Sequence, residues 1–392
     1  MLSFELGDEL SQLQATVKDF AAREIRPSLR ATEKNGPSKA LSEAFESLGL
    51  LTLDWPEAAG GAGLSAQYRA VVEEELAAGD LGSAFALDRG GAAAVFLRTV
   101  GTPQALDALK DLASGGARAA LAMAEAGKAQ DDFRVTAQRA GDGWSLNGTK
   151  AYVLGGGDAS VHVVLAQVEA GKGLPGAGAF LVRGAQGIRA GKTWTTLGLG
   201  GTPLREVHFE TVKLPASARL EAPGKLPATL RAFYDALGIT TAARAVGAAR
   251  AAYEYALGYA NERQAFGKPI GHFQAVAFTL ADMATQVDAA RWLVWKAAWQ
   301  STQGSATAEV AAAQAQALET AFFCANMAVQ VLGGAGYVKD HPAEKWMRDV
   351  KTLALYGQHA QAAEATLAAA ELGTPLDSAD LFPASSFHPA FS

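Results

Sequence analysis

The apolar positions in the first 120 residues follow a helical period. Leu10, Leu13 and Val17 lie three and four residues apart, so they form one apolar face of a helix. Several later segments with the same period stop at glycine or before proline, the residues that end helices. We therefore expect a helical domain over residues 1–120.

The period changes to two near Arg134. Val135 and Ala137 alternate with polar residues, and Asn147-Gly148 is a strong signal for a β-hairpin turn. Three further runs have strand character: 161–168, 178–183 and 206–210. The pattern predicts an antiparallel β domain, a barrel or sandwich, over residues 121–222.

The helical period then returns in long alanine-rich segments. They cover residues 226–264, 272–302, 306–332 and 342–372. Helices this long and this rich in small residues pack closely, so we expect a four-helix bundle over residues 223–373. Residues 374–392, with several prolines and serines, are predicted to form a tail. The predicted fold class is therefore α+β, with a helical domain on each side of a β domain.

Composition excludes several classes of function. The net charge is −6 and the basic residues are scattered, so no nucleic-acid footprint is present. The longest apolar runs are far shorter than a membrane span, and the acidic N-terminus is unlike a signal peptide, so we expect a cytoplasmic protein with no membrane contact. The six histidines lack metal-ligand spacing, so we predict no metal site. The single cysteine, Cys324, is predicted to be a buried small apolar residue.

One short stretch conflicts with the helical pattern around it. VQVLGGAGY, residues 329–337, places three glycines within four positions between two alanine-rich segments. Three glycines in a helix give up roughly 2 to 3 kcal/mol relative to alanine. Something must therefore gain from the missing side chains.

Four sequence words occur at matching places in this helix, strand, helix order. They are LNGTK (146–150), ERQAFGKPIGHFQ (262–274), QVLGGAGY (330–337) and RDVKTLALY (348–356). With these words the chain resembles the acyl-CoA dehydrogenase family of flavoenzymes over essentially its whole length. The resemblance implies FAD as cofactor, an acyl-CoA substrate, and an electron-transfer flavoprotein as electron acceptor. It also implies an oligomer, either a homotetramer or a hetero-oligomer with a catalytically intact homologue.

The resemblance assigns FAD contacts to residues in two groups. The first group would hold the adenosine diphosphate half of FAD bound mainly by a neighbouring subunit, with Arg263 on the pyrophosphate. An arginine fork suits phosphate oxygens, and glycines let backbone N–H groups approach an anion. Its other members are Phe266, Gln274, Gln330, Gly333 and Gly334, while His359 and Gln361 are further cofactor contacts. The second group, Tyr152 and Leu154, occupies the positions beside the flavin ring.

The catalytic carboxylate of the family is missing. Its usual position is Gly357, and its alternative position in other members is Leu237. The arginine that commonly follows the latter matches Gly238. Asp235, two residues before Leu237, and His359, two residues after Gly357, are the candidate substitute bases. Removing a general base typically lowers the rate by 10² to 10⁴.

Words of the β domain have changed as well. The T-E-P word beside the flavin appears as Ala124-Glu125-Ala126, and the G-S-D substrate word is degraded in residues 127–132. Three functions therefore stay open. The first is an FAD-dependent acyl-CoA dehydrogenase that oxidises the Cα–Cβ bond of an acyl thioester. The others are a non-catalytic subunit that completes a partner's FAD site, and a flavin oxidase of a substrate without CoA.

Overall fold

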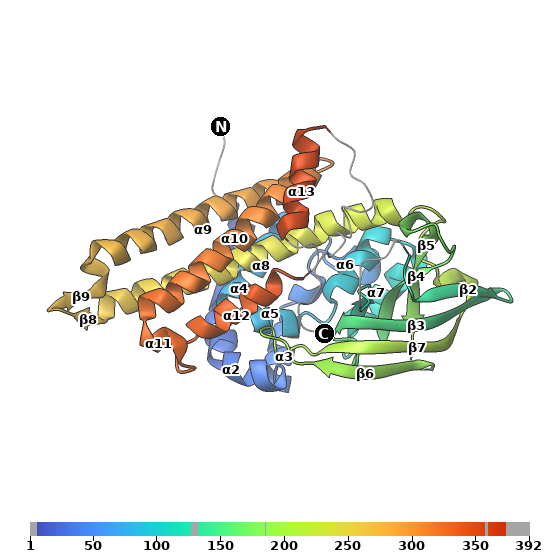
Figure 1. The fold of residues 1–392 in the computed structure, drawn as a ribbon, viewed down its shortest axis with the longest axis horizontal. Coiled ribbons are helices and arrows are strands. Elements are labelled where there is room, and N and C mark those ends of the chain that lie inside the picture. The colour runs from blue at the N-terminus through green and yellow to red at the C-terminus, as the bar shows by residue number, and fades with distance from the viewer. Residues whose placement is uncertain (1–5, 127–131, 185, 357–359, 374–392) are drawn as a thin grey trace.

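The computed structural model describes residues 6–126, 132–184, 186–356 and 360–373. The chain forms helices and a seven-stranded sheet, which lies at one end of the molecule in Figure 1, and the predicted α+β class is confirmed. The predicted tail at 374–392 lies outside the described residues, and so do the candidate catalytic positions Gly357 and His359.

Some helices of the N-terminal region begin at a capping side chain. Ser38 caps α3 by accepting a hydrogen bond from the Leu41 N–H at 3.2 Å, and Thr102 caps α7, whose first residue is Pro103. Helix α4 is buried over most of its length and packs against α8 of the C-terminal region. The helices are α1 (Asp8–Phe20), α2 (Arg26–Asn35), α3 (Lys39–Ser47), α4 (Ala66–Gly79), α5 (Leu81–Leu87), α6 (Gly91–Val100) and α7 (Pro103–Ala113).

The middle region is one seven-stranded sheet with the order β1-β4-β2-β3-β7-β6, and β5 pairs with β4. The strands are β1 (Ala119–Ala122), β2 (Thr136–Ala140), β3 (Gly143–Leu154), β4 (Val161–Gln167), β5 (Ala177–Arg183), β6 (Ile188–Trp194) and β7 (Leu204–Leu214). Most pairs are antiparallel, but β1 and β2 each pair with β4 in parallel. The predicted antiparallel pairing holds for the other pairs of this sheet, and the parallel pairs with β4, one of them made by the unpredicted strand β1, are an addition to it.

The predicted hairpin turn at Asn147-Gly148 is wrong. Both residues lie inside β3, where the pairing with β7 shifts register between Leu146 and Gly148. The Asn147 side-chain oxygen accepts a hydrogen bond from the Thr211 N–H at 2.8 Å. A Cβ on Gly148 would lie 2.9 Å from the Val135 Cα, so this glycine permits close strand approach at a β-bulge.

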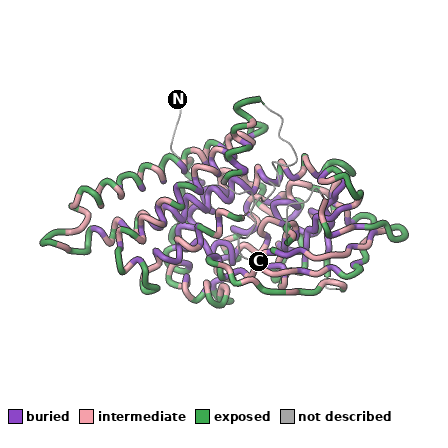
Figure 2. The backbone as a smooth tube through the Cα atoms, in the orientation of Figure 1, coloured by how far each residue is buried: buried purple, intermediate pink, exposed green. Residues whose placement is uncertain are grey.

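Long helices form the C-terminal region, and the fourth predicted segment is two helices rather than one. The helices are α8 (Leu226–Glu262), α9 (Gln274–Gln300), α10 (Thr307–Leu332), α11 (Gly334–Tyr337), α12 (Ala343–Leu353) and α13 (Ala360–Glu371). Figure 2 shows α8 and α10 in the buried centre, with the outer side of α9 exposed. Cys324 is fully buried on α10, as predicted. Among the described helices, none has both the length and the apolarity needed to cross a bilayer.

Candidate active site and cofactor surfaces

A cavity of about 610 Å³ lies where the sheet meets the two helical regions. Its walls come from α5, α6, β1, β3, the loop between β6 and β7, α8 and α12 (Figure 1). The lining includes Phe85, Asp88, Ala92, Arg118, Met123, Ala124, Tyr152, Leu154, Leu197, Leu199, Phe233, Leu237, Lys351, Leu355 and Tyr356. Apolar side chains predominate, so the cavity suits a largely apolar ligand group.

The structure brings the two predicted flavin-ring positions, Tyr152 and Leu154, into this cavity. They share one face of β3, and the Tyr152 ring lies 5.3 Å from the Trp194 ring. Trp194 is fixed in turn because its indole N–H donates to the Ala151 carbonyl at 2.8 Å. The Tyr152 ring, held from outside the cavity by Trp194, can face a planar ring system.

A buried ion pair fixes the part of the wall that contains Met123 and Ala124. Lys150 is fully buried, and its Nζ donates to the Glu125 carboxylate at 2.6 Å and to the Met123 carbonyl at 2.9 Å. Burial lowers the pKa of Lys150 to about 8, and the charge of Glu125 opposes the shift. The LNGTK word therefore has a structural role that sequence reasoning did not assign: its lysine holds the Met123–Glu125 segment against the cavity.

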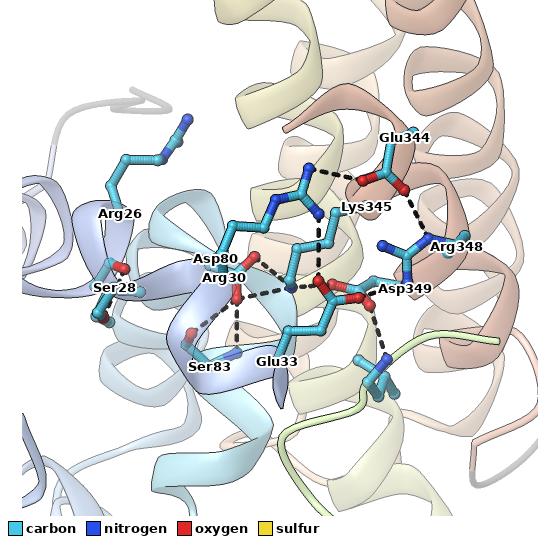
Figure 3. A network of polar contacts seen from close by, with 12 residues as sticks. Arg26, Ser28, Arg30, Glu33, Asp80, Ser83, Glu344, Lys345, Arg348 and Asp349 are labelled. Carbon is cyan, nitrogen blue, oxygen red and sulfur yellow. Dashed lines mark hydrogen bonds and ion pairs between the residues drawn. The ribbon is translucent and has the colours of Figure 1, made fainter. Parts of the chain in front are cut away.

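A second buried network joins the N-terminal helices to α12, as Figure 3 shows. The Lys345 Nζ donates to Asp80 at 2.7 Å and to Asp349 at 2.6 Å, and all three side chains are almost completely buried. Arg348 pairs with Glu33 at 2.6 Å. Burial disfavours the charged form of Lys345, but the two carboxylates outweigh it and raise its pKa.

The same network positions the loop between β6 and β7, which lines the cavity. The Asp349 carboxylate accepts a hydrogen bond from the Leu199 N–H at 2.7 Å, and the Thr352 hydroxyl accepts one from the Gly198 N–H at 2.9 Å. A Cβ on Gly198 would lie 2.4 Å from the Arg348 carbonyl oxygen. The RDVKTLALY word thus shapes the cavity by anchoring a loop from the neighbouring region.

The alternative position of the family base lies at the cavity but carries no ionisable group. Leu237 is buried and lines the wall beside Phe233. At Gly238, an added Cβ would lie 2.5 Å from the Val310 side chain and 3.0 Å from the Gln314 side chain. These side chains fill the space next to Gly238, so the missing arginine leaves no vacant space behind it.

Asp235 lies elsewhere. It lines a second cavity of about 510 Å³, and its carboxylate accepts a hydrogen bond from the Thr307 hydroxyl at 2.6 Å. Burial raises the pKa of Asp235. Because Thr307 is the first residue of α10, Asp235 stabilises that helix N-terminus across the bundle. The structure does not bring Asp235 together with Tyr152, Leu154 and Leu237, so it offers no support for Asp235 as the base.

Asp88 is the one carboxylate among the described residues that line the first cavity. It accepts a hydrogen bond from the Arg244 guanidinium at 2.8 Å and one from the Gly91 N–H at 2.8 Å. Burial alone would raise the pKa of Asp88, but the charge and hydrogen bond of Arg244 outweigh it and hold the pKa below its usual value. Asp88 is therefore a weak proton acceptor.

The residues predicted to contact the adenosine diphosphate half lie away from this cavity. Arg263 follows the last residue of α8 and precedes a hairpin of β8 (Gln264–Ala265) and β9 (Lys268–Pro269). This hairpin and α11 lie at the end of the bundle remote from the sheet (Figure 1). The side chains of this predicted group are exposed: Arg263, Phe266, Gln274 and Gln330. Gln361, a further predicted cofactor contact, is exposed on α13.

Phe266 has an unusual environment for an aromatic residue. It sits in the hairpin turn with φ +50° and is 97% exposed. A left-handed conformation costs a non-glycine residue roughly 1 to 2 kcal/mol. Its ring meets the Phe273 ring edge-on at 6.2 Å and otherwise faces outward, so it suits contact with a ligand or another subunit.

The three glycines of residues 333–336 have different roles. Gly333 ends α10 with φ +58°, a conformation that glycine adopts without strain. Gly336 is needed for packing, since a Cβ there would lie 2.4 Å from the Val329 carbonyl oxygen. An added Cβ at Gly333 or Gly334 would have nothing within 4 Å, so the backbone there is open to a ligand.

The helix, sheet, helix architecture and the mostly apolar cavity agree with the fold expected from the sequence. Comparison with known proteins agrees over nearly the whole chain. Three family models match in succession: "Acyl-CoA dehydrogenase, N-terminal domain" over residues 7–116, "middle domain" over residues 120–212 and "C-terminal domain" over residues 236–369.

Individual relatives give the same result. "Probable acyl-CoA dehydrogenase fadE25" of Mycobacterium leprae is 34% identical over 363 residues, covering 90% of this chain and 92% of the relative. The structure of butyryl-CoA dehydrogenase from Megasphaera elsdenii is similar with a TM-score of 0.87 and 30% identity, covering 95% of this chain and 100% of that one. An FAD complex of PigA has a TM-score of 0.87 and 25% identity, covering 95% and 99%. The chain belongs to the acyl-CoA dehydrogenase family.

FAD is the cofactor, and the residues present fit it. The Tyr152 ring, which packs against Trp194, offers a surface for a planar ring. The Gly333 N–H donates to the Gln330 carbonyl at 3.1 Å, so the open backbone offers an anion the N–H group of Gly334. Arg263 supplies an exposed guanidinium at the same end of the bundle as the glycines. Among the described residues no group of three or more His, Cys, Asp or Glu could hold a metal ion.

Proposed function

We propose that this protein oxidises an acyl-CoA thioester at the Cα–Cβ bond and passes the electrons to an electron-transfer flavoprotein. The observation that carries the proposal is the apolar cavity in which Tyr152, Leu154 and Leu237 meet. FAD bound beside Tyr152 and Leu154 would supply the acceptor for the hydride of the acyl β-carbon, and the α-proton would pass to His359, the candidate substitute base. The chain itself binds the acyl group, orients it and excludes water from it.

The walls of the cavity support these roles. Phe233, Leu237 and Tyr356 present buried or half-buried apolar surface on the helical side. Leu355 lines the cavity and is 81% exposed, which places it at the opening, where a polar thioester tail would leave toward solvent. Removing water around the acyl group strengthens every electrostatic interaction made there.

The length of α8 supports a cofactor shared between subunits. This helix has 37 residues, which corresponds to about 55 Å. Phe233 and Leu237 near its start line the cavity, whereas Arg263 follows its end. A dinucleotide with its ring in the cavity is too short to reach Arg263 of the same chain, so the Arg263 surface serves the FAD of an adjoining subunit.

The second candidate function is a non-catalytic subunit that completes a partner's FAD site. The observation that favours it is the absence of a free carboxylate on the described walls, where Asp88 is bound by Arg244. Such a subunit would keep Arg263 and the open glycine backbone while turning over substrate slowly or not at all.

Anaerobic reduction of the flavin separates the two functions. The purified protein is expected to be yellow, with one FAD per chain, and to bleach when an acyl-CoA is added without oxygen. A Leu355→Asp variant is expected to bleach at least tenfold more slowly, because the new charge repels the anionic thioester tail at the opening. Leu372→Asp is the matched control, since Leu372 is 77% exposed and does not line the cavity. A wild-type protein that binds FAD but never bleaches contradicts the first function and favours the second.

Mixed subunits test whether the cofactor is shared. Arg263→Ala and Leu355→Asp, each expressed alone, are expected to give little active protein. When the two variants are expressed together, a mixed pair has one intact site: the cavity comes from the Arg263→Ala chain and Arg263 comes from the Leu355→Asp chain. Part of the activity is therefore expected to return. No recovery in verified mixed oligomers would place both halves of the site on one chain.

A further inference from the structure

Next to the cavity lies a cluster of buried ion pairs that contains equal numbers of positive and negative side chains. Its members are three arginines and three carboxylates: Arg69, Arg98, Arg244, Asp54, Glu73 and Asp88. Arg69 pairs with Asp54 at 2.5 Å, and Arg244 pairs with Glu73 at 2.7 Å and with Asp88 at 2.8 Å. Arg98 also pairs with Asp54. Each carboxylate in the cluster is thus neutralised by an arginine of the cluster.

Arg118 adds a further positive charge to this side of the cavity. It directly precedes β1 and lines the cavity together with Asp88, Gly91 and Ala92. Its guanidinium donates to the carbonyl oxygens of Ala86 at 2.8 Å and Asp88 at 3.5 Å. Within the described part of the chain, no carboxylate lies within ion-pair distance of Arg118.

The remaining environment keeps this charge in place without neutralising it. The two carbonyls lie at the C-terminal end of α5, so they offer partial rather than full negative charge. Burial lowers the pKa of Arg118, while the more distant carboxylates of Asp88 and Asp158 oppose the shift. The arginine stem packs over Gly155, where a Cβ would lie 2.9 Å from its Cδ. A guanidinium has five N–H donors, and two hydrogen bonds leave three for a ligand.

We propose that Arg118 binds a negatively charged group on the acyl chain of the substrate, so that the protein selects acyl thioesters ending in a carboxylate. This inference rests on the proposed function. Asp88, the nearest carboxylate, does not prevent it, because Arg244 and the Gly91 N–H already occupy its oxygens. A planar guanidinium recognises a carboxylate through paired hydrogen bonds, and such charge-assisted bonds are strong in a partly buried site.

The test compares two thioesters of equal chain length on the FAD-loaded protein. Glutaryl-CoA carries a terminal carboxylate and pentanoyl-CoA does not. Binding is measured by calorimetry, and reduction by the loss of flavin absorbance. We expect the wild type to bind glutaryl-CoA at least tenfold more tightly than pentanoyl-CoA. Arg118→Met is expected to lower glutaryl-CoA affinity by tenfold or more and to leave or improve pentanoyl-CoA binding, whereas Arg118→Lys keeps part of the preference.

Arg89→Met is the matched control. Arg89 donates to the Ala117 carbonyl and pairs with Glu46 close by, but it does not line the cavity, so its removal is expected to leave the preference unchanged. Equal affinity of the wild type for both thioesters would overturn the inference and leave the proposed function standing. This measurement requires the wild-type protein alone. An equal loss for both thioesters in Arg118→Met would overturn it too, because the arginine would then serve a phosphate of FAD or CoA. If neither thioester binds, the proposed function itself fails.

Discussion

Replacing Lys345 by methionine removes the one cation between two buried carboxylates. Lys345 is 1% exposed, and its Nζ lies 2.7 Å from Asp80 and 2.6 Å from Asp349. Methionine has a similar length and fills the same space, so the change removes charge rather than volume. Breaking a buried ion pair from one side typically costs about 3 to 5 kcal/mol. We expect a loss of this size at pH 7.

The loss is expected to depend on pH in a definite direction. Burial and the charge of Asp80 already raise the pKa of Asp349, and Lys345 opposes this shift. Without the lysine the pKa of Asp349 rises further, so the folded variant binds a proton that the unfolded chain releases. Stability of the variant then falls as pH rises, with a slope of up to about 1.4 kcal/mol per pH unit. Its deficit relative to wild type should therefore be smaller at pH 5 than at pH 7.

Urea unfolding of wild type and variant at pH 5 and pH 7 measures both effects. Lys39→Met is the control: Lys39 forms a surface pair with Glu43 at 3.5 Å with its side chain 90% exposed, so its loss should change stability by less than about 1 kcal/mol. Adding Asp80→Asn to Lys345→Met should recover part of the loss. A deficit below 1 kcal/mol at pH 7, or one that stays constant down to pH 5, refutes the description of this network as a buried ion cluster.

Other predictions concern the cavity wall, the empty base position and the glycines. Because the pKa of Lys150 is lowered from 10.5 to about 8, the unfolded chain holds a proton between these values that the folded protein lacks, and this group makes stability rise with pH across that window. Urea midpoints from pH 8 to pH 10 should show the rise in wild type and a weaker one in Lys150→Met. Leu237→Glu places a carboxylate on the cavity wall, and anaerobic bleaching should accelerate by about 10² if this position is the place for a base; no acceleration in a folded, FAD-loaded variant contradicts that role. Gly336→Ala should lower the thermal midpoint, since its Cβ would meet the Val329 carbonyl oxygen at 2.4 Å, whereas Gly334→Ala should leave the thermal midpoint of the flavin-free protein nearly unchanged but reduce FAD retention.

The arrangement of helices and sheet follows from local signals along the chain. A helical period, capping residues such as Ser38 and Thr102, and long alanine-rich segments each act over a few turns, and the helices of both regions form where these signals lie. The error at Asn147-Gly148 has a physical cause. The same dipeptide that favours a tight turn also suits a β-bulge. The close contact of Gly148 with Val135, the residue before β2, selects the bulge here.

The cavity is harder to predict because its parts are distant in sequence. Sequence words place Tyr152 and Leu154 beside the flavin, but nothing local indicates that Asp349 holds the Leu199 N–H or that Lys150 holds the Met123 carbonyl. A buried lysine and a surface lysine look alike in a single amino-acid sequence. Their contacts depend on which helix faces which strand, and that is a property of the assembled fold.

Asp235 and Arg118 show that the place of a charged residue in the fold, rather than its place in the sequence, decides which cavity it lines. Asp235 is two residues from Leu237, and a turn of 3.6 residues carries that short step to a different side of α8 and a different cavity. Arg118 belongs to none of the four sequence words, yet its position directly before β1 places it on the cavity wall. No carboxylate of the described chain lies within ion-pair distance of its guanidinium there. Nearness to a catalytic position in sequence is therefore a weaker guide to chemistry than an unbalanced charge on the wall of the cavity.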